Sequence, residues 1–112
     1  NHLINNFSSN IIYNNALIVK NDKYIEFYNI KNGNLFSKIN IKKTLKKHSK
    51  LIKAISINNK LHLFTSDGTL LIFNSKLEIQ KKIDLKINKI NKIYTYQGKM
   101  FISTEKGFTY II

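Results

Sequence analysis

Histidines and carboxylates are the side chains of this sequence that could bind a metal ion or act as general acids and bases, and their spacing fits neither role. The histidines His2, His48 and His62 lie far apart and show neither the His-x-x-x-His nor the carboxylate spacing of a zinc site. His62 stands between Leu61 and Leu63 in a strand-like pattern, so we interpret it as an outward-facing or packed ring. The sequence therefore predicts no metal site.

The remaining reactive residues also lack the arrangements that enzymes use. The six acids are scattered singly along the chain: Asp22, Glu26, Asp67, Glu78, Asp84 and Glu105. The absence of cysteine excludes disulfides, cysteine nucleophiles and thiolate metal sites. The four glycines form neither a Gly-x-Ser-x-Gly motif nor a phosphate-cradling loop. We therefore expect the chain not to be an enzyme and to bind no cofactor.

A large excess of positive charge is the most distinctive chemical feature of the sequence. The formal net charge is +13, and all 19 residues counted as Lys or Arg are lysines. They are densest in an acid-free stretch whose candidate surface comprises Lys42, Lys43, Lys46, Lys47, Lys50 and Lys53. If this stretch forms a short helix, one face would consist of Ile41, Leu45, His48 and Ile52. Such a basic amphipathic turn could bind nucleic-acid backbone, anionic membrane or an acidic protein.

Two alternatives to a binding role stay open for these lysines. The excess of Lys, Asn and Ile is typical of proteins from AT-rich genomes, and that usage would raise the pI without any polyanionic partner. The stretch would also serve as a solvated link between two structural units. The absence of arginine argues against sequence-specific reading of bases, because bidentate contacts to guanine or phosphate are an arginine speciality.

An internal repeat indicates which elements carry these residues. Residues 59–73 align without a gap to residues 98–112, at an offset of 39 positions, and residues 15–29 align to 60–74 at an offset of 45. Repeats of about 40 to 50 residues are typical of β-propeller blades. The repeat therefore favours a propeller over an unrepeated β-fold.

Each copy predicts a β-hairpin. Apolar runs flank turns at Asp22-Lys23, Asp67-Gly68 and Lys106-Gly107, and Asp67-Gly68 is the strongest of them because Gly tolerates the positive φ of a type I′ turn. The run Leu70–Phe73 shows no polar alternation, which predicts a strand covered on both faces. Flanking strands are expected at 53–57, 78–85, 35–41 and 93–96.

These elements predict an all-β chain that forms two to three four-stranded antiparallel blades of a β-propeller. The whole chain would be a single partial propeller domain. Its repeat units would lie at about 9–41, 53–85 and 92–112, with a basic link at 42–52. Propellers usually have four or more blades, so we expect a fragment of a larger propeller. The missing blades would belong to a longer chain. Two alternatives stay open: copies would assemble around an axis, or the three units would fold as an open or compact stack of sheets.

One stretch resembles a known repeat family. Residues 27–38 resemble the strand-turn-strand motif of pyrroloquinoline-quinone-type (quinoprotein-like) propeller repeats, with Asn29 at the Asp position, Asn32 at the Thr and Gly33 at the Gly. Ser37 replaces the docking tryptophan, and the second copy has Ser75-Lys76 instead of the Thr-Gly turn. The resemblance is to the cofactor-free branch, which includes the outer-membrane barrel-assembly lipoprotein of Gram-negative bacteria.

The resemblance implies a non-catalytic scaffold that presents loops and blade edges to protein partners, in the assembly of envelope or outer-membrane proteins. It implies a periplasmic or outer-membrane-associated location, while the residues themselves leave the compartment open. It does not imply quinone binding, since the carboxylate cluster and metal of such a site are absent from the sequence. A cytoplasmic WD-type scaffold, without its Gly-His and Trp-Asp dipeptides, and a basic module for nucleic acid or anionic membrane are the other classes.

Overall fold

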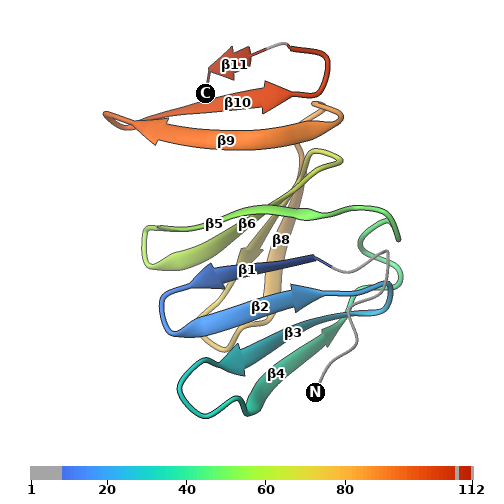
Figure 1. Ribbon diagram of the computed structural model, residues 1–112, viewed down its shortest axis with the longest axis vertical. Coiled ribbons are helices and arrows are strands. Elements are labelled where there is room, and N and C mark those ends of the chain that lie inside the picture. Colours follow the sequence, from blue (N-terminus) through green and yellow to red (C-terminus); the bar gives the residue numbers. More distant parts are fainter. Residues whose placement is uncertain (1–8, 108, 112) are drawn as a thin grey trace.

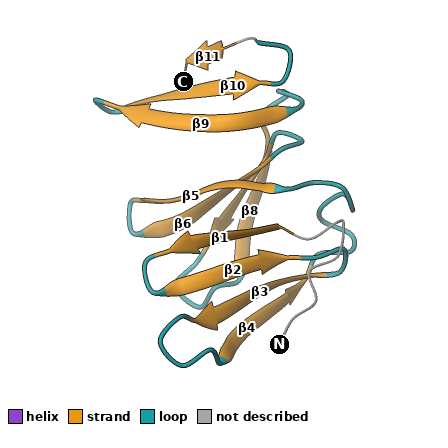
Figure 2. Ribbon diagram, in the orientation of Figure 1, coloured by secondary structure: helices purple, strands orange, loops and turns teal. Residues whose placement is uncertain are grey.

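Three antiparallel sheets make up the protein. The computed structural model describes residues 9–107 and 109–111, and within them there are eleven strands and no helix (Figure 2). The first sheet has the order β1-β2-β3-β4, with β1 (Ser9–Tyr13), β2 (Ala16–Lys20), β3 (Tyr24–Asn29) and β4 (Leu35–Asn40). The second has the order β5-β6-β7-β8, with β5 (Leu51–Ile57), β6 (Lys60–Thr65), β7 (Thr69–Phe73) and β8 (Ile79–Asp84). The third joins β9 (Ile90–Tyr96), β10 (Lys99–Thr104) and β11 (Thr109–Ile111) in sequence order.

The sheets are stacked in chain order, so that the second sheet lies between the other two (Figure 1). The first strands of the sheets are neighbours, with β1 in contact with β5 and β5 in contact with β9. Each sheet is a meander of hairpins, which is the local order that the repeat predicts. The expected all-β architecture is confirmed, with two four-stranded sheets and a three-stranded one.

Two hydrophobic cores hold the stack together. The first core lies between the first and second sheets and includes Ile18, Phe27 and Phe73, and the rings of Phe27 and Phe73 meet edge to face at 5.8 Å. The second core lies between the second and third sheets and includes Leu70 and Ile102. Strand β7 contributes to both cores, because successive side chains of a strand point to opposite faces. The prediction that Leu70–Phe73 is covered on both faces is confirmed.

Two strands begin earlier than the sequence pattern indicates. Strand β5 begins at Leu51, inside the expected link, and β9 begins at Ile90 rather than at Ile93. In both strands a β-bulge interrupts the pairing near the extra residues, at Leu51/Lys53 and opposite Ser103/Thr104. The bulge breaks the regular alternation, so the early residues do not look like part of a strand in the sequence.

The turn at Asp67-Gly68 differs from the expected type I′ turn. A type I′ turn requires positive φ at both central residues, and of these two only Gly68 has it, at +85°. The Gly68 N–H donates to the carbonyl of Thr65 at 3.1 Å, so the connection is a three-residue loop that ends in a left-handed glycine. The type I′ geometry occurs instead at Asn58-Asn59, where φ is 52° and 63°. The short asparagine side chain tolerates that conformation.

Gly68 also allows a close approach between two loops. Its carbonyl accepts a hydrogen bond from the N–H of Leu85 at 2.8 Å, which brings the chain after β8 against the hairpin. A Cβ at position 68 would lie 2.1 Å from the carbonyl oxygen of Ile87, a distance that real Cβ atoms do not reach. Gly68 is therefore required by the contact as well as by its φ.

We expect Gly68→Ala to destabilise the protein by about 3 kcal/mol or more, because left-handed strain of about 1–2 kcal/mol adds to displacement of the 85–89 backbone. Gly33→Ala is the matched control, since Gly33 has φ +74° but no atom within 4 Å of an added Cβ. The control should lose only the strain of about 1–2 kcal/mol. Urea denaturation followed by circular dichroism measures both, and equal losses would contradict the role assigned to the Ile87 contact.

Candidate functional site

The lysine-rich link is a pair of turns and not a helix. The N–H groups of Thr44 and Leu45 both donate to the carbonyl of Ile41, at 2.9 and 3.0 Å, and the N–H of Ser49 donates to Lys46 at 3.1 Å. Ile41 and Leu45 are buried in the first core, whereas His48 is exposed. The expected amphipathic helix is therefore wrong. Ile41 and Leu45 are four residues apart, and this spacing is compatible with a single turn that packs on the core as well as with a helix.

The structure separates the six lysines that the sequence grouped together. Lys42, Lys43, Lys46, Lys47 and Lys50 are exposed on the link. Lys53 lies on β5 and is half-buried, so it is not part of the same surface. A further lysine from another strand reaches the link, because Lys82 on β8 donates to the carbonyl of Thr44 at 2.6 Å.

A buried lysine that the sequence pattern did not single out lies between the first two sheets. Lys20, the last residue of β2, is fully buried at 0% exposure. It pairs with Ile25 in the register of β2 and β3, on the face that carries Ile18. Its Nζ donates to the carbonyl of Lys47 at 3.4 Å. Burial lowers the pKa of Lys20, and the charges of Asp67 and Asp22 oppose that shift.

Asp67, one of the two carboxylates whose charge acts on Lys20, is held by hydroxyl groups. Its Oδ1 accepts hydrogen bonds from Ser49 Oγ at 3.0 Å and from Thr65 Oγ1 at 2.5 Å. Burial by itself would raise the pKa of Asp67, but the hydrogen bonds from Thr65, Ser49 and Thr69 lower it below its ordinary value. Asp67 therefore ties the link to the β6–β7 loop as an ionised group.

A cleft of about 600 Å³ opens where four connecting segments meet at one end of the second and third sheets. We call it the loop cleft. It is lined by the link, the β6–β7 loop, the β8–β9 connection and the β10–β11 loop, with Lys46, Asp67, Lys86, Lys89, Glu105 and Lys106 among its lining residues. Of the six lysines that the sequence grouped as a candidate surface, only Lys46 lines it.

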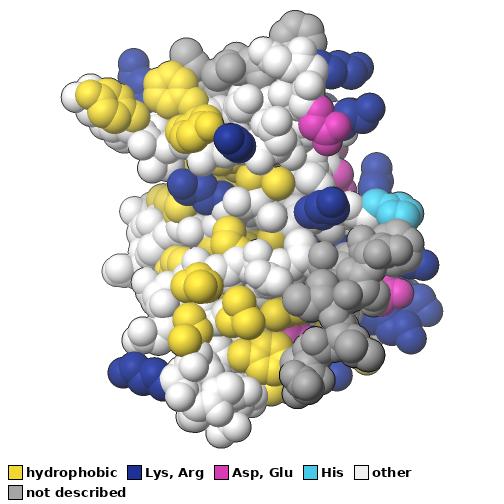
Figure 3. Space-filling view, in the orientation of Figure 1, with side chains coloured by type: hydrophobic (Ala, Val, Ile, Leu, Met, Phe, Trp, Pro, Cys, Tyr) yellow, Lys and Arg dark blue, Asp and Glu magenta, His cyan; other side chains and the backbone are white. Residues whose placement is uncertain are grey.

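The face of the first sheet that points away from the second sheet carries an apolar row. Cross-strand pairing aligns Ile12 with Leu17, Leu17 with Tyr28, and Tyr28 with Leu35. Ile12 and Leu35, at the ends of the row, are 67% and 45% exposed, whereas Leu17 is half-buried and Tyr28 is buried. We call this row the outer row. Hydrophobic side chains gather over β1–β4 in the space-filling view (Figure 3).

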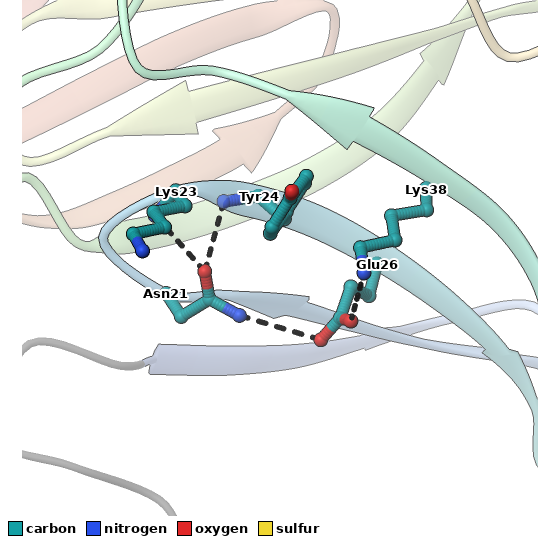
Figure 4. Close-up of polar contacts among 5 residues, drawn as sticks. All are labelled: Asn21, Lys23, Tyr24, Glu26 and Lys38. Atoms are coloured by element: carbon teal, nitrogen blue, oxygen red, sulfur yellow. Dashed lines mark hydrogen bonds and ion pairs between the residues drawn. The ribbon is translucent and has the colours of Figure 1, made fainter.

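Polar contacts lie beside the outer row (Figure 4). Asn21 donates to Glu26 at 3.4 Å, and the Lys38 ammonium lies 4.0 Å from the other Glu26 oxygen and 4.1 Å above the Tyr24 ring. Burial raises the pKa of Tyr28, and the charge of Glu26 raises it further. Glu26 is thus a buried carboxylate at the edge of an apolar surface.

The third sheet exposes aromatic residues on its own outward face. Tyr94 pairs with Phe101 across β9 and β10, and Tyr94 and Tyr96 are 53% and 66% exposed. The second group of hydrophobic side chains in Figure 3 lies over this hairpin, at the upper left. Both ends of the stack therefore present apolar sheet faces.

Within residues 9–107 and 109–111, the structure brings no three histidine, cysteine or acidic side chains together at a metal-binding distance. His62 Nδ1 lies 3.0 Å from the carbonyl of Lys60, and His2 lies outside the described residues. The same part of the chain contains no helix long and apolar enough to span a bilayer.

Comparison with known proteins identifies the fold. The crystal structure of BamB from Moraxella catarrhalis matches with a TM-score of 0.62 at 15% sequence identity, over 93% of this chain and 30% of that one. The chain therefore spans less than a third of the length of this structure. No family model matches the sequence, and no curated protein matches it at the level of sequence. The fold is that of a β-propeller, and the three sheets are its blades.

We expect Asp67→Asn to lower the free energy of unfolding at pH 7 by about 1–3 kcal/mol, because the variant loses a half-buried, charge-assisted acceptor of two hydroxyl hydrogen bonds. The folded-state pKa is lowered, so ionised Asp67 stabilises the fold above the unfolded pKa of about 3.9, and this contribution is lost as the pH falls below it. Urea unfolding at pH 7 and pH 3 should therefore show a smaller loss on acidification in Asp67→Asn than in the wild type.

Glu105→Gln provides the control for this measurement. Its side chain is exposed and forms no hydrogen bond or ion pair with the described residues. The change should alter stability by no more than about 0.5 kcal/mol. A pH dependence that is the same for both variants would show that Asp67 is not the group responsible.

Proposed function

We propose that this chain is part of a non-catalytic β-propeller scaffold that binds other proteins, and that the scaffold acts in the assembly of outer-membrane proteins. The fold similarity to BamB supports the first part of the proposal. The cofactor-free quinoprotein-like motif at Asn29–Gly33 supports the second, because that branch includes the barrel-assembly lipoprotein. The corresponding location is periplasmic or at the outer membrane.

The outer row provides the main structural support for this proposal. In the second blade, Phe73 pairs with Leu61 and Ile79 across three strands, and these residues contribute to the first core between blades. In the first blade, Tyr28 pairs with Leu17 and Leu35 in the same pattern. The outer row thus occupies the positions that pack between blades, and apolar side chains left exposed together on a sheet face favour protein contacts.

Two kinds of protein suit such a face. Another blade would pack on it as the second blade packs on the first, either from a longer polypeptide or from a second copy. A separate protein would cover the same residues as a partner in a complex. In either case the expected occupant presents an apolar surface, because burial of the outer row removes Ile12 and Leu35 from water.

The alternative function is a basic module that binds nucleic acid or an anionic membrane through Lys42–Lys53. Five of its six lysines are exposed on one link, which favours this role. They project from two turns rather than from one face of a helix, and all lack the planar guanidinium that reads bases or phosphate in a bidentate manner. Composition alone accounts for their number, whereas it does not account for the paired apolar rows.

Photocrosslinking tests the scaffold proposal directly. A photoreactive amino acid at position 35 or 94, on the two outward faces, should form covalent adducts with protein when the chain is expressed in the periplasm of a Gram-negative bacterium. Position 76, in an exposed turn, is the matched control and should form few adducts. Adducts with outer-membrane assembly proteins would support the finer proposal. Adducts that form equally at position 76 would contradict it.

The four changes Lys42→Gln, Lys43→Gln, Lys46→Gln and Lys47→Gln distinguish the two functions once a protein partner is in hand. If the partner docks on the apolar faces, the quadruple variant should associate more slowly and with weaker salt dependence while its dissociation rate stays nearly unchanged. Surface plasmon resonance measures both rates, with thermal stability as the control. A large rise in the dissociation rate would favour the basic module.

A further inference from the structure

The loop cleft has a size and a frame that suit a small ligand. Its volume of about 600 Å³ falls within the range of about 300–1,000 Å³ that is common for ligand sites. Backbone hydrogen bonds connect its walls: Ser66 N–H donates to Lys50 at 2.8 Å, and Ile90 N–H donates to Ser66 at 2.8 Å. The β10–β11 loop is joined to the β8–β9 connection by the N–H of Glu105, which donates to the carbonyl of Lys89 at 2.8 Å. The cleft is therefore held by the fold itself.

Positive charge is concentrated in this cleft. Four of the twelve lining residues are lysines, compared with 19 in the 112 residues of the chain, which is about twice the overall share. Lys46, Lys86, Lys89 and Lys106 are all exposed, and none of their ammonium groups has a hydrogen bond or ion pair with the described residues. These four charges are available to an anion without breaking an existing contact.

Two acids line the same cleft, and their situations differ. Asp67 is engaged by Ser49 and Thr65, and its charge also acts on buried Lys20. Glu105 is exposed, and its carboxylate has no partner among the described residues. Glu105 is thus the one described carboxylate of the cleft that is not already engaged, and it should weaken the binding of an anion.

Uncharged donors add to the lysines. The N–H groups of Ile87, Asn88 and Lys89 donate to no acceptor within the described part of the chain. Lys86 and Lys89 both have left-handed backbone conformations, with φ of 59° and 55°. The β8–β9 connection therefore has backbone N–H groups without an acceptor among the described residues, and Ser66, which also lines the cleft, has a hydroxyl group.

We propose that the loop cleft binds a compound with two or more linked phosphate groups, such as a diphosphate or a short polyphosphate chain. Lysine binds phosphate as a point charge, and several lysines spread around a concave site match a multiply charged anion better than a single carboxylate. The concave shape favours a small anion over the flat contact of a duplex or a protein surface. The same chemistry would be supplied by a free compound or by a phosphorylated lipid headgroup.

The inference is independent of the scaffold proposal, because its residues lie away from both outward faces of the stack. It also departs from the sequence-based surface, since three of its four lysines come from loops outside residues 42–53. Two triple variants separate the cleft from general positive charge. One carries Lys86→Gln, Lys89→Gln and Lys106→Gln, and the other carries Lys42→Gln, Lys43→Gln and Lys50→Gln.

Isothermal titration calorimetry with inorganic pyrophosphate and tripolyphosphate, at an ionic strength of about 0.15 M, provides the readout. The cleft variant should bind at least about tenfold more weakly than the wild type, a loss of about 1.4 kcal/mol. The link variant removes the same charge and should bind within about twofold of the wild type. Glu105→Gln should bind more tightly than the wild type. Equal weakening in both triple variants, or no binding by the wild type, would overturn the proposal.

A second measurement does not depend on the variants being folded. Acetylation of the wild-type protein, read out by mass spectrometry, should be slowed by pyrophosphate at Lys86, Lys89 and Lys106 and unchanged at Lys42 and Lys43. Uniform protection would count against the cleft. Cosedimentation with vesicles that contain a polyprenyl diphosphate identifies the source of the ligand, with phosphatidylglycerol vesicles as the control for general negative charge. Binding that requires the diphosphate lipid and is lost in the cleft variant indicates a lipid headgroup, and binding of free tripolyphosphate without such vesicle binding indicates a soluble compound.

Discussion

Every blade of this protein has two apolar faces, and the stack exists because those faces must be removed from water. The second blade satisfies the constraint completely, with Leu71 and Phe73 in one core and Leu70 in the other. The first and third blades satisfy it fully on one side only, because on their outward faces Ile12 and Tyr94 stay exposed although Tyr28 is buried. The same force that stacks the three sheets therefore favours further contacts at both ends, and the scaffold proposal follows from it.

Polar groups between the blades give the stack its specificity at the loop end. Lys20 is buried on a face that otherwise packs through apolar residues. The negative charge of Asp67, from the next blade, favours the charged form of Lys20. Such buried charge is costly unless it is paired and hydrogen-bonded. Asp67 also binds Ser49 of the link, so one carboxylate connects two blades and the segment between them. The walls of the loop cleft take their positions from this arrangement and from the contact of Gly68 with Ile87.

A propeller fold does not specify a function, because its blades support many unrelated sites. In this chain the binding sites are therefore a matter of which side chains the surface presents. The apolar rows lie on the two outward faces, whereas the four exposed lysines of the loop cleft lie at one end of the second and third sheets. Binding of a protein and binding of an anion would use separate parts of the molecule, so neither would exclude the other.

The sequence by itself determined the repeat, the all-β class and the double burial of Leu70–Phe73, because these depend on local patterns of apolar residues and turns. The gapless sequence alignment at an offset of 45 is correct for β3 and β7, but it aligns Leu17 with His62. In the structure the hairpin registers show that Leu17 corresponds to Leu61. A shift of one residue moves a side chain to the opposite face of a sheet, so the pattern could not identify the outer row or the burial of Lys20. It likewise grouped Lys42–Lys53 by proximity in the chain and missed Lys86, Lys89 and Lys106. Only the tertiary structure brings those loops together, because hydrogen bonds between residues far apart in the sequence decide where the loops meet.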